Sequence, residues 1–281
     1  MQQLTADDLR TFYAALATSG GRSGRGHAPK TVKNVHGLIH RALEDAVEQG
    51  LVPRNVAALR SARPAKVPKV ERRVWEPEDL RAFLDAMATH RLGALWLLDC
   101  TTGLRRSELL GLPWRALDLD KGEIAVTQRL VVVDGKPTVR HGTKTPRSAR
   151  RIALDPVTVA ALKAHRARQV SERLAWRSAW IDTGLVFTRE DGTPLRPASL
   201  TRQFARLTAE VGLPALTLHG LRHSYATAGL AAGVPVRVMS ERLGHANTAI
   251  TSDLYQHVLP AMDAEAAASV ASLILGGENV R

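Results

Sequence analysis

The sequence predicts a mainly helical α+β fold, with a small helical domain followed by a larger helical domain that carries an inserted antiparallel β-hairpin or small sheet. Two observations support this prediction. Apolar residues recur at helical spacing through most of the 281-residue chain. The exception is a β-branched stretch at 123–133, which ends at Asp134–Gly135, a pair typical of hairpin turns.

The N-terminal domain contains two predicted helices. Thr5, followed by Asp7 and Asp8, is typical of a helix cap and first turn, and this helix is expected to run to about residue 17. A Gly- and Ser-rich loop follows over 18–28. Pro29 then opens a second, longer helical pattern, which Gly50 ends.

Residues 60–74 have the composition of a basic linker. Six of them are basic, against the single acid Glu71, and Pro64 and Pro68 favour an extended backbone. One interpretation is a charge run that is merely solvated. The other is a linker that joins the two halves of a DNA clamp.

A second domain begins at Trp75. Periodicity and capping predict helices over 77–88, 92–102 and 105–111. After the 123–133 strand, shorter returning strands are expected at 138–139 and 151–154. From residue 155 the pattern is mostly helical again, with a short strand expected at 185–188.

Composition narrows the partners. The net charge of +12 and the pI of about 10.6 favour a polyanion, with nucleic acid as the first choice and an anionic membrane surface as the alternative. No apolar run approaches the roughly 20 residues of a membrane span, and the N-terminus does not resemble a signal peptide. Cys100 is the single cysteine, which excludes an internal disulfide and a multi-cysteine zinc site. We therefore expect a cytoplasmic protein.

Six residues form an ordered set that suits one chemistry. In chain order they are Arg105, Lys144, His219, Arg222, His245 and Tyr255. The first five can donate to a phosphate, and the tyrosine is a latent oxygen nucleophile. Together they suit attack of a phenol on a phosphodiester, with the charge on phosphorus held by protein groups. This chemistry predicts neither a metal nor a cofactor.

The two histidines near Arg222 have an alternative interpretation. His219 and His223 are spaced like two zinc ligands on one helix face. However, Gly220 stands where a zinc-protease helix has glutamate, and the charge of Arg222 would oppose a cation. The phosphate interpretation is therefore preferred.

Local context supports the other members of the set. Arg105 opens a helix, and Glu108, three residues later, can hold its guanidinium. Lys144 lies in the loop of the basic hairpin, from which a lysine can reach a groove as a general acid. His245 follows a helix-ending glycine. Tyr255, with a phenol pKa of about 10, needs nearby cations or a base to act as a nucleophile.

The ordered set and its flanking motifs resemble the tyrosine recombinase, or phage integrase, family from about Trp75 to Pro260. The most specific motifs are Thr-Gly-Leu-Arg-Arg-Ser-Glu-Leu-Leu-Gly-Leu, His-Gly-Leu-Arg-His-Ser-Tyr-Ala-Thr, Glu-Arg-Leu-Gly-His-Ala and Tyr-Gln-His-Val. The resemblance implies a role for each residue. Tyr255 is the nucleophile, Arg105 and Arg222 clamp the non-bridging oxygens, and Lys144 protonates the leaving 5′ oxygen. His219 exchanges the tyrosine proton and His245 hydrogen-bonds the phosphate.

The resemblance also implies a domain plan. Residues 1–59 are a partial core-type DNA-binding domain, 60–74 the linker, 75–260 the catalytic domain, and 261–281 a C-terminal helix and tail for exchange between protomers. The N-terminal domain is shorter than is usual, which suggests a truncated copy, a misassigned start or a minimal variant. The residues expected to contact DNA are Lys30, Lys33, Arg72, Arg73, Arg140, Arg147, Arg150 and Arg151.

The implied function is site-specific DNA recombination through a transient 3′-phosphotyrosyl bond. Expected partners are double-stranded DNA and, on synapsed DNA, a homotetramer of protomers that are monomeric in solution. A directionality factor or a host DNA-bending protein is a further expected partner, and the expected location is the cytoplasm, at the nucleoid. Two alternatives stay open: a type IB topoisomerase-like enzyme, and a truncated or degenerate integrase that binds DNA without catalysis.

Overall fold

The computed structural model describes residues 4–21, 24–68, 73–142 and 149–245. The chain divides into two compact units, residues 1–71 and 72–281. The predicted fold class is confirmed, because the described elements are mostly helices with a small antiparallel β insertion. Among the described residues, no helix is both long and apolar enough to cross a lipid bilayer.

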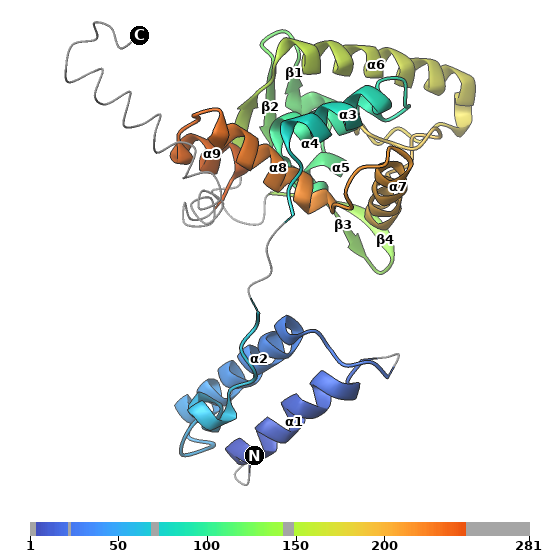
Figure 1. The fold of residues 1–281 in the computed structure, drawn as a ribbon. Helices are drawn as coiled ribbons and strands as arrows, with labels where there is room; N and C mark the ends of the chain where they lie inside the picture. Colours follow the sequence, from blue (N-terminus) through green and yellow to red (C-terminus); the bar gives the residue numbers. More distant parts are fainter. Residues whose placement is uncertain (1–3, 22–23, 69–72, 143–148, 246–281) are drawn as a thin grey trace, which may run out of the picture. The chain divides into compact units, whose positions relative to one another are not determined.

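The N-terminal unit is a small helical body (Figure 1, blue to cyan). Its elements are α1 (Ala6–Ser19), α2 (Pro29–Glu48), η1 (Val56–Ala58) and η2 (Arg60–Ala62). Thr5 and Asp8 form the capping box that starts α1, as the sequence predicts. Its core consists of Leu9, Tyr13, Val32, Leu43, Ala57 and Ala62. Because Ala62 is fully buried in that core, residues 60–62 belong to the compact unit and not to the linker that was expected to begin at 60.

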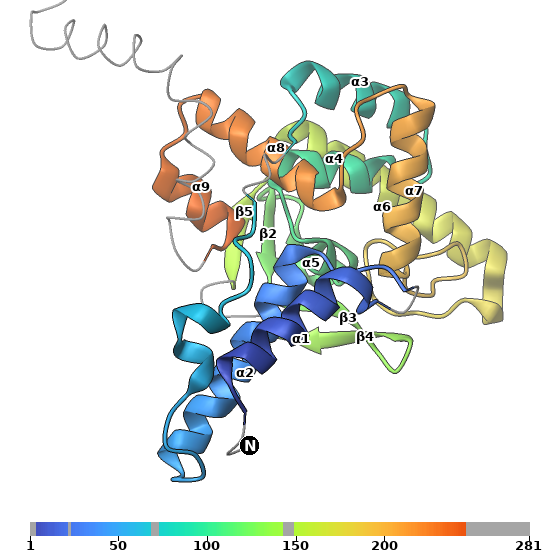
Figure 2. The ribbon, with the colours of Figure 1, turned by 60° about the horizontal axis from the view of Figure 1, so that its bottom comes forward.

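Seven α-helices make up about half of the described part of the second unit (Figures 1 and 2). They are α3 (Pro77–Met87), α4 (Gly93–Thr102), α5 (Arg106–Leu110), α6 (Pro156–Trp176), α7 (Pro197–Glu210), α8 (Leu218–Ala231) and α9 (Val236–Leu243), with short η3 (Trp114–Ala116) and η5 (Arg177–Ala179). The prolines that open α3, α6 and α7 occupy the first helical turn, where the missing N–H has no intrahelical partner to lose.

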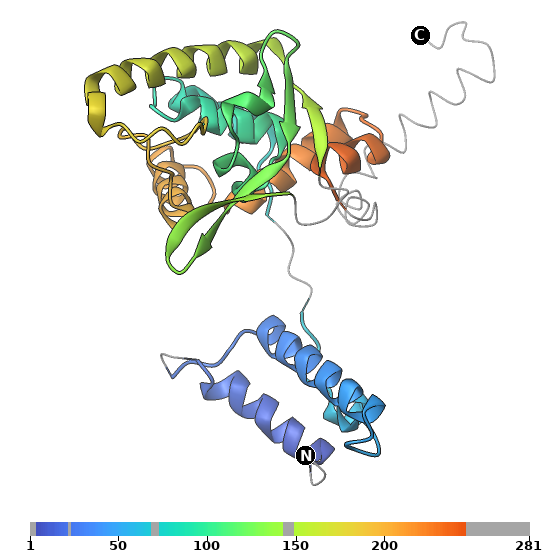
Figure 3. The same cartoon turned by 180° about the vertical axis from the view of Figure 1, so that it is seen from behind.

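The β insertion forms two small sheets. Its strands are β1 (Leu117–Asp118), β2 (Glu123–Val126), β3 (Gln128–Val133), β4 (Lys136–His141) and β5 (Arg150–Ala153). The strand predicted over 123–133 is interrupted at Thr127, because β2 pairs with β5 whereas β3 pairs with β4. The turn after β3 has positive φ at Asp134 (48°) and Gly135 (74°), as predicted for that pair. The β3–β4 hairpin projects from the body of the unit (Figure 3).

The prediction of a strand at 185–188 is wrong. Leu185 forms an isolated bridge with Pro113, and Thr188 forms another with Pro194, without a continuous strand between them. A proline has no backbone N–H, so neither partner can extend a ladder of hydrogen bonds. The apolar run Leu185–Phe187 is buried for packing and not as part of a sheet.

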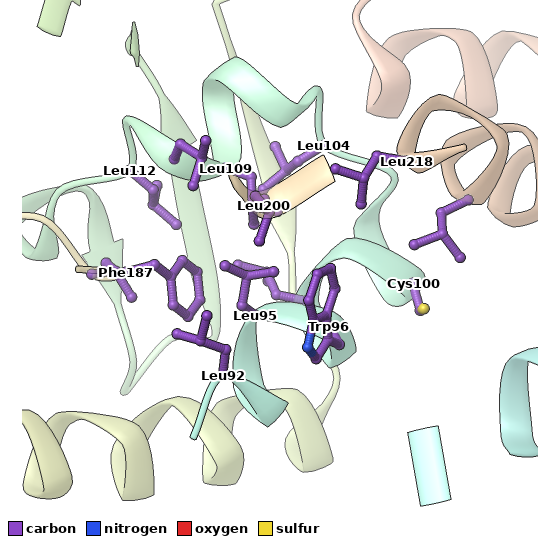
Figure 4. Close-up of a cluster of buried hydrophobic side chains, with 14 of the residues drawn as sticks. Leu92, Leu95, Trp96, Cys100, Leu104, Leu109, Leu112, Phe187, Leu200 and Leu218 are labelled. Carbon is purple, nitrogen blue, oxygen red and sulfur yellow. The ribbon is translucent and has the colours of Figure 1, made fainter. Parts of the chain in front are cut away.

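The core of the second unit surrounds α4 (Figure 4). Trp96 on this helix is fully buried and packs against Phe83 and Phe204, with ring centroids 5.8 and 5.7 Å away. The helix ends at Gly103, whose φ of 59° gives a left-handed turn. A Cβ at Gly103 would lie 2.6 Å from the Tyr225 ring, so this close turn requires glycine. The turn delivers Arg105 to the start of α5 at the surface of the core.

Candidate active site

Three arginines converge on the C-terminal end of α9. This helix stops at Gly244 in a left-handed turn, which leaves its last carbonyl groups without partners inside the helix. Each of three successive carbonyls accepts a 2.6 Å bond from a different guanidinium. The bonds run from Arg150, Arg222 and Arg105 to the carbonyl oxygens of Arg242, Leu243 and Gly244, in that order. The partial negative charge of a helix C-terminus thus holds positive groups from β5, α8 and α5 together.

Glu108 supports Arg105, as the sequence predicts, but it also binds Arg150. The Arg105 Nη1 lies 2.7 Å from Oε1 of Glu108, and the Arg150 Nη2 lies 3.0 Å from Oε2. Burial by itself raises the pKa of this carboxyl, yet hydrogen bonds and charge from Arg150 and Arg105 outweigh it and lower the pKa below its ordinary value. Glu108 is therefore ionised and ties the two arginines together.

Arg222 is the most deeply buried member of the cluster. It lies on α8, a helix capped by the Thr217 side chain, and the residue is 2% exposed. Its Nη1 donates to the carbonyl of Gly103 at 2.6 Å, in addition to the bond to α9. Burial, and after it the charge of Arg105, lowers the pKa of this guanidinium to about 9. The group still carries its charge at neutral pH, and its burial makes that charge effective on a nearby anion.

His245 follows the α9 turn and is partly exposed. Its backbone N–H donates to the carbonyl of Ser240 at 3.0 Å, and this bond ties the backbone of His245 to the end of α9. Burial, followed by the charges of Arg222 and Arg105, lowers the pKa of its imidazole to about 4. His245 is therefore neutral at pH 7 and can donate one hydrogen bond to a phosphate oxygen without carrying charge.

His219 and His223 lie on α8 with ring centroids 4.5 Å apart in an edge-to-face arrangement. His219 is exposed, whereas His223 is 8% exposed. Within residues 4–245, apart from the gaps named above, no group of three or more His, Cys, Asp and Glu side chains could hold a metal ion. The zinc alternative therefore finds no third ligand of these types among the described residues.

The structure brings together five residues that the sequence singled out. Arg105, Glu108, Arg222 and His245 were expected at this site, whereas Arg150 was expected to contact DNA. α8, which carries Arg222, and β5, which carries Arg150, both lie against α9, and His245 follows the turn that ends α9 (Figure 2). Tyr255, Lys144, Arg72 and Arg147 lie outside the described residues.

Most of the described residues expected to contact DNA are exposed. This holds for Lys30 and Lys33 on α2, Arg73, Arg140 on β4 and Arg151 on β5. Arg150 differs, since its side chain is only 7% exposed and lies among the site residues. The sequence could not separate Arg150 from Arg151, because which of two adjacent strand residues faces inward depends on the register of β5.

Sequence reasoning missed Asp99. This residue lies on α4 and is 2% exposed, and its Oδ1 has no hydrogen-bond partner among the residues that the structure describes. Burial raises the pKa of the carboxyl to about 8, although the charge of Arg222 pulls it down. Asp99 is thus mostly protonated at neutral pH and does not neutralise the charge of Arg222. An acid inside the apolar run Trp-Leu-Leu-Asp-Cys was the signal that could have found it.

Asp99→Asn is expected to stabilise the protein increasingly as pH rises. The folded-state pKa lies above that of the unfolded chain, so stability is lost between about pH 4 and pH 8 as the unfolded chain releases this proton. The neutral amide removes that loss, and we expect a gain of about 1–3 kcal/mol at pH 8. Urea unfolding across this pH range measures it. A gain that is the same at every pH would contradict the burial of an ionisable group here.

Comparisons with known proteins match the chain to one family. A model described as the phage integrase family matches residues 73–262. A protein named tyrosine recombinase XerC-like, from Caldanaerobacter subterraneus subsp. tengcongensis, is 31% identical over 267 residues, which cover 89% of this chain and 68% of that protein. The ICEBs1 integrase of Bacillus subtilis is 26% identical, with 98% of this chain and 72% of that protein covered.

Solved structures share the fold. The Tn1549 transposon integrase in complex with transposon right end DNA has a TM-score of 0.76 at 20% identity, covering 91% of this chain and 82% of that one. The XerH site-specific recombinase bound to palindromic difH substrate has a TM-score of 0.66 at 18% identity, covering 95% and 72%. The family match and the 31% identity together show that the chain belongs to the phage integrase family of tyrosine recombinases.

Proposed function

We propose that this site-specific tyrosine recombinase cleaves and rejoins DNA through a transient 3′-phosphotyrosyl bond at Tyr255. One observation carries the proposal: three buried or partly buried arginines converge on the end of α9, next to a neutral His245. Such a group of fixed donors suits the charge that develops on a phosphate oxygen in the transition state.

The proposed reaction is a transfer in two reversible steps. The Tyr255 oxygen attacks phosphorus, its proton passes to His219, and the 5′ oxygen leaves with a proton from Lys144. Arg105 and Arg222 hold the non-bridging oxygens, and His245 donates to one of them. The 5′ hydroxyl of a partner strand then attacks the phosphotyrosyl bond and releases the tyrosine. Since the covalent intermediate retains the energy of the broken bond, the cycle needs no ATP.

We also propose that catalysis needs no metal ion. The cluster already supplies concentrated positive charge, which acts after burial in lowering the pKa values of Arg222 and His245. A cation at the same place would be repelled by Arg105, Arg222 and Arg150.

The assembly that we propose extends beyond one chain. The partner is double-stranded DNA, and the exposed basic residues of α2 and β4 are proposed to lie along its phosphates. Residues 1–59 are proposed to act as a core-type DNA-binding domain and 261–281 to dock on a neighbouring protomer of a synaptic tetramer. We further propose that the protein is monomeric in solution and works with a directionality factor or a host DNA-bending protein. Its proposed location is the nucleoid in the cytoplasm.

Trapping a covalent adduct tests the proposed function. A nicked DNA substrate that loses a short fragment on cleavage is incubated with the protein in excess chelator, and the products are resolved under denaturing conditions. We expect a protein–DNA adduct that protease removes. No adduct would indicate a DNA-binding protein without catalysis, and strict dependence on added metal would overturn the metal-free mechanism.

Adduct formation alone does not separate a recombinase from a type IB topoisomerase-like enzyme. The second measurement therefore follows exchange between two labelled DNA sites and relaxation of a supercoiled plasmid. A recombinase joins strands from different duplexes, whereas relaxation without joined products would favour the topoisomerase alternative.

A further inference from the structure

Arg150 occupies a position that the proposed mechanism leaves without a role. It is the first residue of β5 and pairs with Val126 on β2. Its side chain is 7% exposed, whereas that of the adjacent Arg151 is 76% exposed and pairs with Glu123 at 3.1 Å. The alternation of a β-strand thus directs one arginine into the protein and its neighbour to solvent.

The guanidinium of Arg150 bridges two groups on different elements. Its Nη2 lies 3.0 Å from Oε2 of Glu108 on α5, and its Nε donates to the carbonyl of Arg242 on α9 at 2.6 Å. The group also packs closely on the α9 turn, since a Cβ at Gly244 would lie 2.9 Å from its Nη1. Arg150 therefore joins β5, α5 and the end of α9 through one rigid planar group.

Both partners of Arg105 are held by this bridge. Arg105 donates to Oε1 of Glu108 and to the carbonyl of Gly244. Arg150 binds the other oxygen of the same carboxylate and a carbonyl two residues earlier in the same helix end. Loss of Arg150 would remove one of the three donors described on this carboxylate, leaving it the Nη1 and the backbone N–H of Arg105. It would also take this donor from the carbonyl of Arg242 on α9.

We infer that Arg150 is a positioning residue of the phosphate clamp, which fixes Glu108 and the α9 end so that Arg105 and His245 meet the scissile phosphate in register. The inference rests on the proposed function. It differs from the expectation that Arg150 contacts the DNA backbone, because the bonds described here direct its guanidinium to Glu108 and α9. Arg150 also does more than stabilise the fold. Glu108, which it binds, contacts Arg105, and the end of α9, which it also binds, immediately precedes His245.

The test compares Arg150→Ala and Arg150→Lys with the matched control Arg151→Ala, which removes the same charge from the exposed neighbour. Single-turnover cleavage is measured at saturating DNA, and the DNA dissociation constant is measured at several salt concentrations. We expect Arg150→Ala to cleave about tenfold to a hundredfold more slowly, the range for loss of one charge-assisted hydrogen bond. Its DNA affinity and salt dependence should match those of the parent protein. Arg150→Lys keeps the charge but cannot make both bonds, so its cleavage rate should fall between those of Arg150→Ala and the parent protein.

Two further measurements exclude a trivial cause. Guanidinium at millimolar concentration should partly restore cleavage by Arg150→Ala and leave Arg151→Ala unchanged, because a small cation can occupy the vacated space, whereas it cannot repair a misfolded chain. A 5′-bridging phosphorothiolate substrate, whose sulfur leaves without a proton, should retain the defect. If Arg150→Ala does not fold, Arg150→Lys carries the cleavage-rate, DNA-affinity and phosphorothiolate measurements, without the guanidinium rescue.

The outcomes are distinct. A weaker affinity with a shallower salt dependence in Arg150→Ala would identify a DNA contact and overturn the inference, as would an unchanged cleavage rate. A defect that disappears on the phosphorothiolate would show that Arg150 acts through the leaving-group acid instead of the clamp. If the parent protein forms no adduct, the proposed function itself fails and this inference falls with it.

Discussion

Tyr255→Phe is expected to abolish covalent attachment to DNA while leaving binding almost unchanged. The substitution removes one oxygen atom, and in the proposed mechanism that atom forms the bond to phosphorus. The described bonds that hold the arginine cluster join residues of α5, α8, α9 and β5, and the substitution alters none of these residues. The measurement is the yield of protease-sensitive adduct on the nicked substrate, together with the DNA dissociation constant of the same preparation.

A second tyrosine provides the control. Tyr225 lies on α8 in the same unit, and its hydroxyl accepts a 2.7 Å hydrogen bond from Nε of Arg242. Tyr225→Phe removes the same atom from a partly buried side chain next to the cluster, so it should lose some stability but keep adduct formation. If the Tyr255→Phe protein still forms the adduct and the Tyr225→Phe protein does not, the nucleophile has been assigned to the wrong residue.

Sequence reasoning succeeded where the signals are local. The Thr5–Asp8 capping box, the proline at the start of α2 and the Asp134–Gly135 turn all appear as predicted. Each of these signals works through a hydrogen bond or a φ value within a few residues, so the surrounding fold has little influence on it. The Arg105–Glu108 pair belongs to the same class, since three residues separate its members.

The features that sequence reasoning missed depend on contacts between distant segments. Arg150 and Glu108 are 42 residues apart, and Arg222 and Gly103 are 119 residues apart. Sequence reading grouped Arg150 with the DNA-contacting residues because a basic run offers no indication of which members are buried. The same limit applies to Asp99, because its raised pKa arises from helices that pack around it and not from its neighbours in the chain.

The convergence on α9 also explains how a cluster of like charges can exist before DNA binds. Arg105, Arg150 and Arg222 repel one another, and burial, followed by this repulsion, lowers the pKa of Arg222. Glu108 and three carbonyls at a helix end offset that repulsion without neutralising the cluster. The donors are therefore held in place in advance, which avoids the cost of ordering them when a phosphate arrives.

Arg222→Ala is expected to slow strand cleavage about a hundredfold to a thousandfold, which corresponds to roughly 2.7–4 kcal/mol for the loss of one positioned donor in a charged transition state. Arg105→Ala should behave similarly. The DNA dissociation constant should change far less, because a site of this kind is surrounded by many other basic residues that bind phosphates in the ground state. Arg222→Ala also leaves the carbonyls of Gly103 and Leu243 without their donor, so a loss of stability is expected as well.

The matched control for these variants is Arg106→Ala. Arg106 is adjacent to Arg105 but exposed, and it donates to the Thr201 hydroxyl at 2.6 Å, away from the cluster. Its loss removes the same charge, so it should weaken DNA binding no more than the other variants and leave the cleavage rate near that of the parent.

Arg222→Lys separates charge from geometry, because an ammonium group keeps the charge but cannot make the paired bonds to two carbonyls. Equal losses in affinity and in rate for Arg222→Ala would mean that this arginine acts on the bound substrate and the transition state alike, as an ordinary backbone contact does. A loss confined to the rate, shared by Arg105→Ala and absent from Arg106→Ala, is the result that a preorganised phosphate clamp requires.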